Sequence, residues 1–260
     1  TKNGTGKLSL SGSSSYSGTT TINTGTLEIT STGLLGGGNY SGDITNKGNF
    51  LYRSDSNQIL SGVISGNGSL TTNGTGTLSL SGNNTYNGTT TITAGTLEIA
   101  ATGRLNGGNY SGNISNSGSF IIGSTNNQTL SGNISGAGSL TKNGSGVLTL
   151  SGNSTYSGAT AINAGTLQVS STGLLGGGSY SGDITNDGVF LFGSNSNQTL
   201  SGIISGTGSL TKNGSGALIL SDINTYTGDT VIDAGTLQVS STGLLGGGSY
   251  SGNITNAGVF

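Results

Sequence analysis

The stretch Gly138–Val169, GSLTKNGSGVLTLSGNSTYSGATAINAGTLQV, sets the pattern for the whole chain. Slightly altered copies occupy Gly68–Ile99 and Gly208–Val239, and a copy that lacks the first three residues begins at Thr1. Equivalent positions recur with a 70-residue period, as shown by the tyrosines Tyr16, Tyr86, Tyr156 and Tyr226. A fixed period of this length indicates a tandem-repeat architecture in which each unit packs mainly on its neighbours.

A shorter pattern, Gly-x-Leu or Gly-x-Phe, recurs within each 70-residue unit. One series of these triplets follows 23-, 20- and 27-residue intervals in turn and then repeats, with its apolar residue at Leu27, Phe50, Leu70, Leu97, Phe120, Leu140, Leu167, Phe190, Leu210, Leu237 and Phe260. Polar and apolar residues alternate near these markers, as in Val147–Leu150, which is typical of short half-buried strands. No segment has apolar residues at helical spacing, and the 53 Gly residues disfavour helices further.

These patterns predict an all-β chain folded as a parallel β-helix, or β-solenoid, with about 23 residues per coil and three coils per 70-residue repeat. The markers would then stack as one interior ladder, with strands of successive coils about 4.8 Å apart. We expect one continuous segment, 1–260, made of the partial repeat 1–67, the repeats 68–137 and 138–207, and the partial repeat 208–260. Because it starts and stops within a repeat, we expect it to be cut from a longer protein that holds the targeting and anchoring parts.

The composition is poor in the residues that catalysis and metal binding use most. The chain has 7 Lys and Arg, 9 Asp and Glu, and no His, Cys, Met, Trp or Pro. Without His and Cys it lacks the commonest metal ligands and general base, and it can form no disulfide. A formal charge of −2 offers no basic face for nucleic acid. We therefore expect no catalytic, cofactor-binding or metal-binding residue, and no enzyme.

Two pairs of carboxylates come nearest to a catalytic arrangement. Asp183 with Asp187, and Asp229 with Asp233, have the spacing that acid–base work in a polysaccharide-degrading β-helix could use. Their counterparts one repeat away are Asn or Ala, so we interpret both pairs as solvated surface. The two arginines, Arg53 and Arg104, have no partner that the spacing suggests, and the recurring Lys2, Lys142 and Lys212 are expected to be solubilising charges in turns.

Other recurring features fit local structural roles. The runs Gly36–Gly38, Gly176–Gly178 and Gly246–Gly248 predict tight corners, since no phosphate-loop Lys-Ser/Thr follows them. Each tyrosine of the 70-residue series is expected to plug or cap its own loop. A recurring Asn-Gln pair would form either a polar contact strip or a set of turn-stabilising amides, at Asn57-Gln58, Asn127-Gln128 and Asn197-Gln198.

One family shares these motifs. The run Gly138–Gly152, followed by Tyr156-Ser-Gly and Ala164-Gly-Thr-Leu, closely resembles the autotransporter-associated β-strand repeat, also called the passenger-associated transport repeat, of bacterial type V secretion. The resemblance covers just under half of each repeat. Small departures, Thr72 in place of Lys and Asp222 in place of Gly, leave the match intact.

The resemblance implies a right-handed parallel β-helix passenger, exported across the outer membrane of a Gram-negative cell. It would be extracellular or on the bacterial cell surface, attached to the outer membrane or released. Members of the family usually carry a signal peptide and a C-terminal translocator β-barrel. That barrel, outside this segment, would be the only contact with a membrane.

Two roles stay open for such a non-catalytic structural rod. It could be the stalk or adhesive surface of an adhesin, or the self-assembling building block of an extracellular filament or matrix, because low net charge gives little repulsion between rods. A polysaccharide-active β-helix enzyme is a distant third. The expected partners are other copies of the chain, or a host or cell-surface glycan or protein; nucleic acid and cofactors are not expected.

Overall fold

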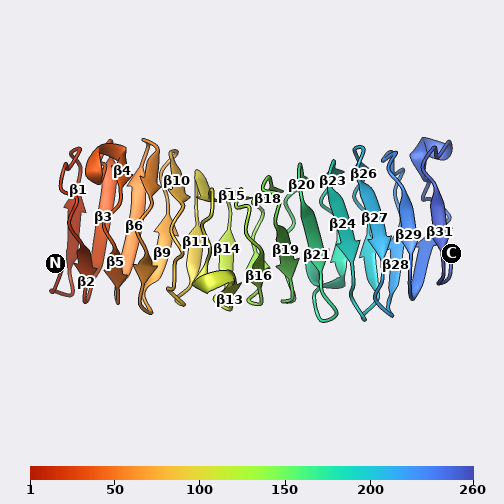
Figure 1. The fold of residues 1–260 in the computed structure, drawn as a ribbon, viewed down its shortest axis with the longest axis horizontal. Coiled ribbons are helices and arrows are strands. Elements are labelled where there is room, and N and C mark those ends of the chain that lie inside the picture. The colour runs from red at the N-terminus through yellow and green to blue at the C-terminus, as the bar shows by residue number, and fades with distance from the viewer.

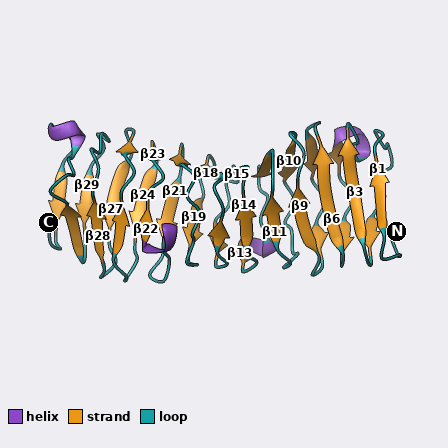
Figure 2. Ribbon diagram, turned by 180° about the vertical axis from the view of Figure 1, so that it is seen from behind, coloured by secondary structure: helices purple, strands orange, loops and turns teal.

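The computed structural model describes residues 1–260 as one straight rod of stacked coils, with the two termini at opposite ends (Figure 1). Almost every regular element is a short strand, and every strand pair is parallel (Figure 2). The predicted β-solenoid is thus confirmed. Its helical content is limited to four 3₁₀ turns: η1 (Gly36–Gly38), η2 (Asn106–Gly108), η3 (Gly176–Gly178) and η4 (Gly246–Gly248).

Each coil passes through three faces, which we number in chain order. Face 1 holds β1 (Lys7–Leu10), β3 (Thr26–Ser31), β6 (Asn49–Ser54), β9 (Ser69–Thr72), β11 (Thr90–Ile92), β14 (Ile114–Asn116), β17 (Ile134–Ser135), β22 (Ser179–Tyr180), β25 (Gln198–Leu200), β28 (Ala217–Leu220) and β30 (Thr236–Val239). Between β17 and β22 its ladder continues through an isolated bridge from Asn153 to Leu174.

The other two faces are built in the same way. Face 2 holds β4 (Asn39–Tyr40), β7 (Gln58–Leu60), β10 (Thr77–Leu80), β12 (Thr96–Ile99), β15 (Ser119–Ile122), β18 (Ser139–Lys142), β20 (Thr160–Ile162), β23 (Ile184–Asn186) and β26 (Ile204–Ser205). Face 3 holds β2 (Thr20–Ile22), β5 (Ile44–Asn46), β8 (Ile64–Ser65), β13 (Asn109–Tyr110), β16 (Gln128–Leu130), β19 (Val147–Leu150), β21 (Thr166–Val169), β24 (Val189–Phe192), β27 (Ser209–Lys212), β29 (Thr230–Ile232) and β31 (Ile254–Asn256).

The coils are on the whole shorter, and less uniform, than the sequence predicted. On face 1, Lys7 pairs with Thr26, which makes a 19-residue coil, whereas Thr90 pairs with Ile114, which makes a 24-residue coil. The 20-residue step is also common, as from Asn49 to Ser69. The coil length varies because the loops between strands, and not the strands themselves, absorb insertions.

A 70-residue repeat is longer than three complete coils. Residues 68–137 contain the nine strands β9 to β17 and one isolated bridge at Asn83, which makes ten strand positions. Three positions complete a coil, so one repeat spans three and a third coils. Equivalent strands therefore move to the next face in each repeat: β1 lies on face 1, β10 on face 2, β19 on face 3 and β28 on face 1 again.

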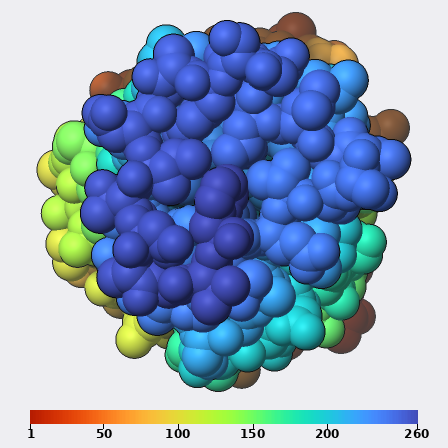
Figure 3. All heavy atoms as spheres, turned by 90° about the vertical axis from the view of Figure 1, so that its right-hand side faces the viewer, coloured from red at the N-terminus to blue at the C-terminus, as the bar shows by residue number.

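The four 3₁₀ turns make this shift visible. In Figure 1, η1 projects at the upper edge near the N-terminus, η2 at the lower edge, and η4 at the upper edge again near the C-terminus. Seen from the C-terminal end, the cross-section is roughly round, and differently coloured earlier segments project at different points around its rim (Figure 3). Successive repeats thus present the same loop in three directions in turn.

Because of this shift, the marker residues do not form the single ladder that the sequence suggested. They form several shorter ladders on different faces. Leu97 stacks beside Phe120 and Phe120 beside Leu140, as predicted, but the next rung is Thr160 and not Leu167. Leu167 starts an equivalent ladder on face 3. The 23- and 20-residue marker intervals are single coils, whereas the 27-residue interval contains four strand positions, one more than a coil.

One apolar core nevertheless runs along the rod, formed by a single cluster of 44 buried residues. Strands such as β12 and β19 alternate half-buried and fully buried positions, and the fully buried ones hold Leu and Ile. At the corners the backbones of neighbouring coils nearly touch. A Cβ at Gly144 would lie 1.9 Å from the Ser124 carbonyl oxygen, which explains why Gly occupies this corner.

Candidate functional site

Most of the recurring polar residues prove to be internal supports of the solenoid. A buried Tyr–Thr–Tyr group is the largest of them. The Thr90 hydroxyl lies 2.9 Å from the Tyr86 hydroxyl and 2.7 Å from the Tyr110 hydroxyl, which donates to the Gly88 carbonyl. The same group recurs with Thr20, Thr160 and Thr230 at its centre.

This arrangement confirms that Tyr86, Tyr156 and Tyr226 fill their own loops, whereas Tyr16 at the N-terminal end of the rod is 39% exposed, and it adds a partner to each. Tyr86 is fully buried and packs edge to face on Tyr110, with ring centroids 5.6 Å apart. Burial raises the pKa of Tyr86 well above its usual range and that of Tyr110 to about 12. The second tyrosine recurs with the same 70-residue period, so its spacing could have indicated the pair.

The Asn-Gln pairs are turn-stabilising amides. Gln128 is buried; its Oε1 accepts from the Leu105 backbone N–H at 2.8 Å, and its Nε2 donates to the Leu105 carbonyl at 3.1 Å. Asn127 Oδ1 accepts from the Val147 backbone N–H of the next coil at 2.9 Å. Because Gln58, Gln128 and Gln198 lie on three different faces, they cannot form one contact strip.

The prediction that the recurring lysines are solubilising charges is wrong for two of the three. Lys142 and Lys212 are 1% and 0% exposed, and their ammonium groups lie inside corners of the rod. Lys142 Nζ donates to the Gly144 carbonyl and, at 3.4 Å, to the Ala164 carbonyl of the next coil. Burial lowers the pKa of Lys142. Thr72 takes this position in the second repeat and donates to the Ala94 carbonyl at 3.4 Å.

The aspartate pairs lie on the surface, as predicted, and three of their four carboxylates bind backbone. Asp183 Oδ1 accepts from the Ile203 N–H at 2.9 Å, and Asp187 Oδ1 accepts from the Thr207 N–H at 2.9 Å. Asp229 Oδ1 accepts from the Asn253 N–H at 2.9 Å. These side chains join one coil to a later one. No group of three or more His, Cys, Asp or Glu side chains is placed to hold a metal ion.

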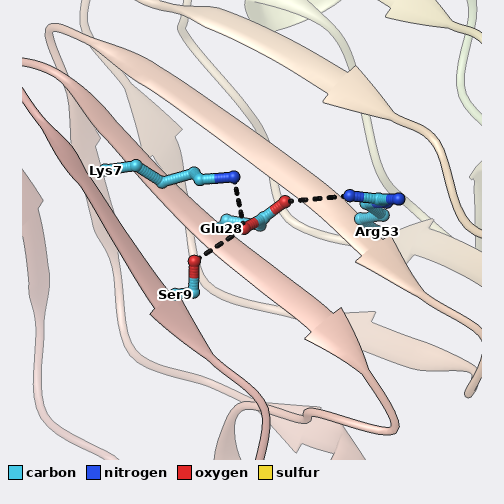
Figure 4. A network of polar contacts seen from close by, with 4 residues as sticks. All are labelled: Lys7, Ser9, Glu28 and Arg53. Carbon is cyan, nitrogen blue, oxygen red and sulfur yellow. Dashed lines mark hydrogen bonds and ion pairs between the residues drawn. The ribbon is translucent and has the colours of Figure 1, made fainter.

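One charged cluster lies at the N-terminal part of face 1 (Figure 4). Its Ser–Glu hydrogen bond recurs between Ser79 and Glu98, but its two basic residues have no counterpart in the second repeat. Glu28 faces outward from β3 yet is only 3% exposed, because side chains of the neighbouring strands cover it. Its Oε2 lies 3.0 Å from Lys7 Nζ and accepts from Ser9 Oγ at 2.6 Å. Its Oε1 lies 3.8 Å from Arg53 Nη1 and accepts no hydrogen bond.

These contacts set the electrostatics of the cluster. The Ser9 hydrogen bond lowers the pKa of the Glu28 carboxyl, Lys7 and Arg53 lower it further, and burial opposes them. The sequence spacing suggested no partner for Arg53, and the structure supplies one in Glu28. Glu28 pairs with Leu51, and Arg53 follows two positions later on the same outward side, a relationship that only the register between β3 and β6 reveals.

A polar groove of about 380 Å³ lies beside this cluster, at the corner where successive coils leave face 1. It is lined by Thr30, Ser31, Arg53, Asp55, Asn73, Gly74, Thr75 and Ala94. The Arg53 side chain is 56% exposed. Asp55 Oδ1 accepts from the Thr75 N–H at 3.0 Å and from the Thr75 hydroxyl at 2.9 Å, which lowers the pKa of Asp55.

Comparison with known proteins agrees with the fold. The family described as Passenger-associated-transport-repeat matches residues 1–29, 70–99, 140–169 and 210–239. The four matches fall on equivalent parts of successive repeats, so each 70-residue unit of the solenoid contains one segment that matches the passenger-associated transport repeat.

A curated relative gives a narrower match. Over 53 residues the chain is 53% identical to a protein named "Adhesin BmaC autotransporter" from Brucella suis biovar 1 (strain 1330). The match covers 20% of this chain and 2% of that adhesin, so it spans only a small part of the relative. No solved structure matches the chain. None of the helical segments has the length and apolar character needed to cross a membrane.

Proposed function

We propose that this segment is the non-catalytic rod of a surface-displayed autotransporter passenger, and that it serves as an adhesin stalk or adhesive surface. The observation that carries the proposal is the unbroken stacking of four passenger repeats on one continuous core. A rod of this kind gains length with every repeat without a new fold. The name of the relative, an autotransporter adhesin, supports the same role on the cell surface, attached or released.

A structural role is also supported by what the polar side chains do. Asp183, Asp187 and Asp229 bind backbone N–H groups of other coils, and Lys142 binds carbonyls at its own corner. A catalytic acid or base must instead reach a substrate proton. We therefore propose that these groups stabilise the rod and take no part in catalysis.

Deletion of one repeat, residues 68–137, from the full-length protein tests the proposal. The deletion preserves the order of strands, because Asn67 is then followed by Gly138, the equivalent of Gly68. It shortens the rod by about 16 Å, three and a third coils at about 4.8 Å each. If the rod is a stalk, we expect cell adhesion to be unchanged by this modest shortening. If the rod is itself the adhesive surface, we expect adhesion to fall in proportion to the number of repeats removed. Adhesion that never depends on the passenger contradicts both.

A second role, self-assembly into an extracellular filament or matrix, is favoured by one patch. Ile223 and Leu244 are bridge partners on face 2, 47% and 42% exposed, and Ile203 lies exposed in the coil before them. Equivalent positions to Ile223 are Ser13, Asn83 and Asn153. Burial of the exposed part of such side chains between rods would stabilise contacts by about 1 kcal/mol each, since more than half of each is already buried.

Sedimentation over a wide concentration range, with negative-stain images of the same samples, tests self-assembly. Ordered bundles that form in the native chain and are lost with Ile223→Asn, which restores the residue of two other repeats, would support it. A single elongated monomer at every concentration would rule it out.

A further inference from the structure

The groove beside Arg53 differs from the equivalent corners of the next two repeats. Strands β3 and β6 pair as far as Thr30 with Arg53 and Ser31 with Ser54. The equivalent pairs in the next two repeats end at Ile99 with Ile122 and Val169 with Phe192. Ser54 Oγ donates to the Ser31 carbonyl at 3.0 Å, which fixes the end of the longer pair. The extra pairing holds the Arg53 backbone in the sheet.

The side chains at this corner are special as well. Positions equivalent to Arg53 hold Gly123 and Gly193, and positions equivalent to Asp55 hold Thr125 and Asn195. The first repeat thus places a cation and a carboxylate where the others have small or neutral residues. In a chain with 7 basic and 9 acidic residues, this concentrates scarce charge at one groove.

The Arg53 guanidinium is paired with one carboxylate and keeps its hydrogen-bond donors available. Its one ion-pair contact runs from Nη1 to the buried Glu28 carboxylate on β3, at 3.8 Å and without a hydrogen bond. A guanidinium has five N–H donors, so others can bind a ligand in the groove. Asp55 uses Oδ1 for Thr75 and keeps Oδ2 as an acceptor. Asn73 and the hydroxyls that line the groove can both donate and accept.

The charge and polarity of the lining select the class of ligand. Arg53 is balanced by Glu28 and Asp55, so the groove attracts no anion strongly. Ala94 is the single apolar residue of the lining, which disfavours a lipid or an apolar peptide. Vicinal hydroxyl groups, each a donor and an acceptor, match an Arg–Asp–Asn set. The groove follows successive coils at the strand spacing of about 4.8 Å, enough for a short chain of sugar rings.

We infer that this groove is a binding site for a neutral saccharide, with Arg53, Asp55 and Asn73 as its polar contacts. The inference rests on the proposed adhesive role and gives it a ligand class and a position. Because the lining has no aromatic ring for a sugar to stack on, the affinity comes from hydrogen bonds and a few methyl groups, and a dissociation constant of about 1 mM is expected.

Titration of the ¹⁵N-labelled 260-residue chain with lactose, maltose and cellobiose, followed by NMR, tests the inference. We expect at least one neutral sugar to shift the amide signals of Ser31, Asp55, Asn73 and Thr75. The variant carrying Arg53→Gly and Asp55→Asn should bind about tenfold more weakly or not at all. It gives the first repeat the residues of Gly193 and Asn195, which the same fold already accommodates, so folding is preserved.

Arg104→Gly is the matched control, because Arg104 lies outside the groove and should leave sugar binding unchanged. Sialyllactose and inorganic phosphate serve as anionic probes. Binding of these anions in preference to every neutral sugar would overturn the inference, as would no binding at all, or binding that the double variant retains. Free sugars report only on the groove, so these outcomes are separate from the adhesion of cells that carry the repeat deletion.

Discussion

Tyr86 and Tyr110 come from successive coils, and their rings pack at 61° to each other on either side of the Thr90 hydroxyl. Tyr110 donates to Gly88, so it accepts from Thr90, which in turn accepts from Tyr86. The three hydroxyls form one directed chain that ends on the backbone. All three residues are buried, so loss of any link leaves a polar group without water or partner.

Thr90→Val should therefore destabilise the rod by about 1–3 kcal/mol, because it retains the shape of the side chain but removes the central hydroxyl. The matched control is Thr91→Val. Thr91 is the outward neighbour on the same strand, and its replacement should change stability by less than about 0.5 kcal/mol. Urea unfolding followed by circular dichroism measures both. Equal effects of the two substitutions would contradict the buried relay.

Alkali should unfold the rod through the same tyrosines. Burial raises the pKa of Tyr110 from its usual value near 10 to about 12, so the folded chain holds this proton more tightly than the unfolded chain. The contribution is complete below pH 10 and is lost as the pH rises from 10 towards 12, by about 1.4 kcal/mol per pH unit. Thermal unfolding across this range, with tyrosinate absorbance recorded in parallel, measures it. A melting temperature that stays level to pH 12 would refute the assignment.

Lys142→Ala should be among the most damaging single changes. It removes a long buried side chain and leaves the Gly144 and Ala164 carbonyls without this donor, at a cost of about 2–5 kcal/mol. Lys142→Thr should cost less, because Thr72 fills the equivalent corner in the second repeat. Hydrogen exchange of β18 and β20 reports the local effect. Unchanged protection in the Ala variant would mean that the corner does not need the ammonium group.

The Glu28 cluster should respond to acid. Its pKa is lowered in the folded chain, so its contribution to stability is present above the unfolded value and is lost as the pH falls through the folded one. Glu28→Gln, the residue found at Gln168, should remove this acid dependence from β1, β3 and β6. Hydrogen exchange of these strands between about pH 3 and 7 tests it. The equivalent strands around Gln168, which lack the carboxylate, are the internal control.

The strands and the repeat were predictable because both depend on local alternation and exact spacing. Leu97, Phe120 and Leu140 stack as the markers indicated, and the Gly-rich corners are where the sequence placed them. The length of the coil was not predictable from the markers, since the 27-residue interval contains one strand position more than a coil. Strand pairing across coils decides that count, and it is a non-local property.

The buried lysines and the Arg53 groove escaped prediction for a different reason. Lys142 stands in a turn-like sequence, Lys-Asn-Gly, that usually lies in solvent, and only the inward direction of the last residue of β18 shows that it is enclosed. Glu28 and Arg53 lie on neighbouring strands of different coils, and their contact depends on the register between β3 and β6. Sequence spacing alone cannot give that register, because the coil length changes from one coil to the next.

The ten strand positions of each repeat also bear on how such a chain can change over generations. Unequal recombination between near-identical copies adds or removes whole 70-residue units, and every such event joins a strand to its proper successor. The coils of the product remain continuous across the junction. Every coil beyond it, however, is rotated by a third of a revolution about the rod axis. In variants with different numbers of repeats, the parts of the chain beyond the junction would thus face one of three directions around the rod axis. A gain of three repeats would restore the original direction.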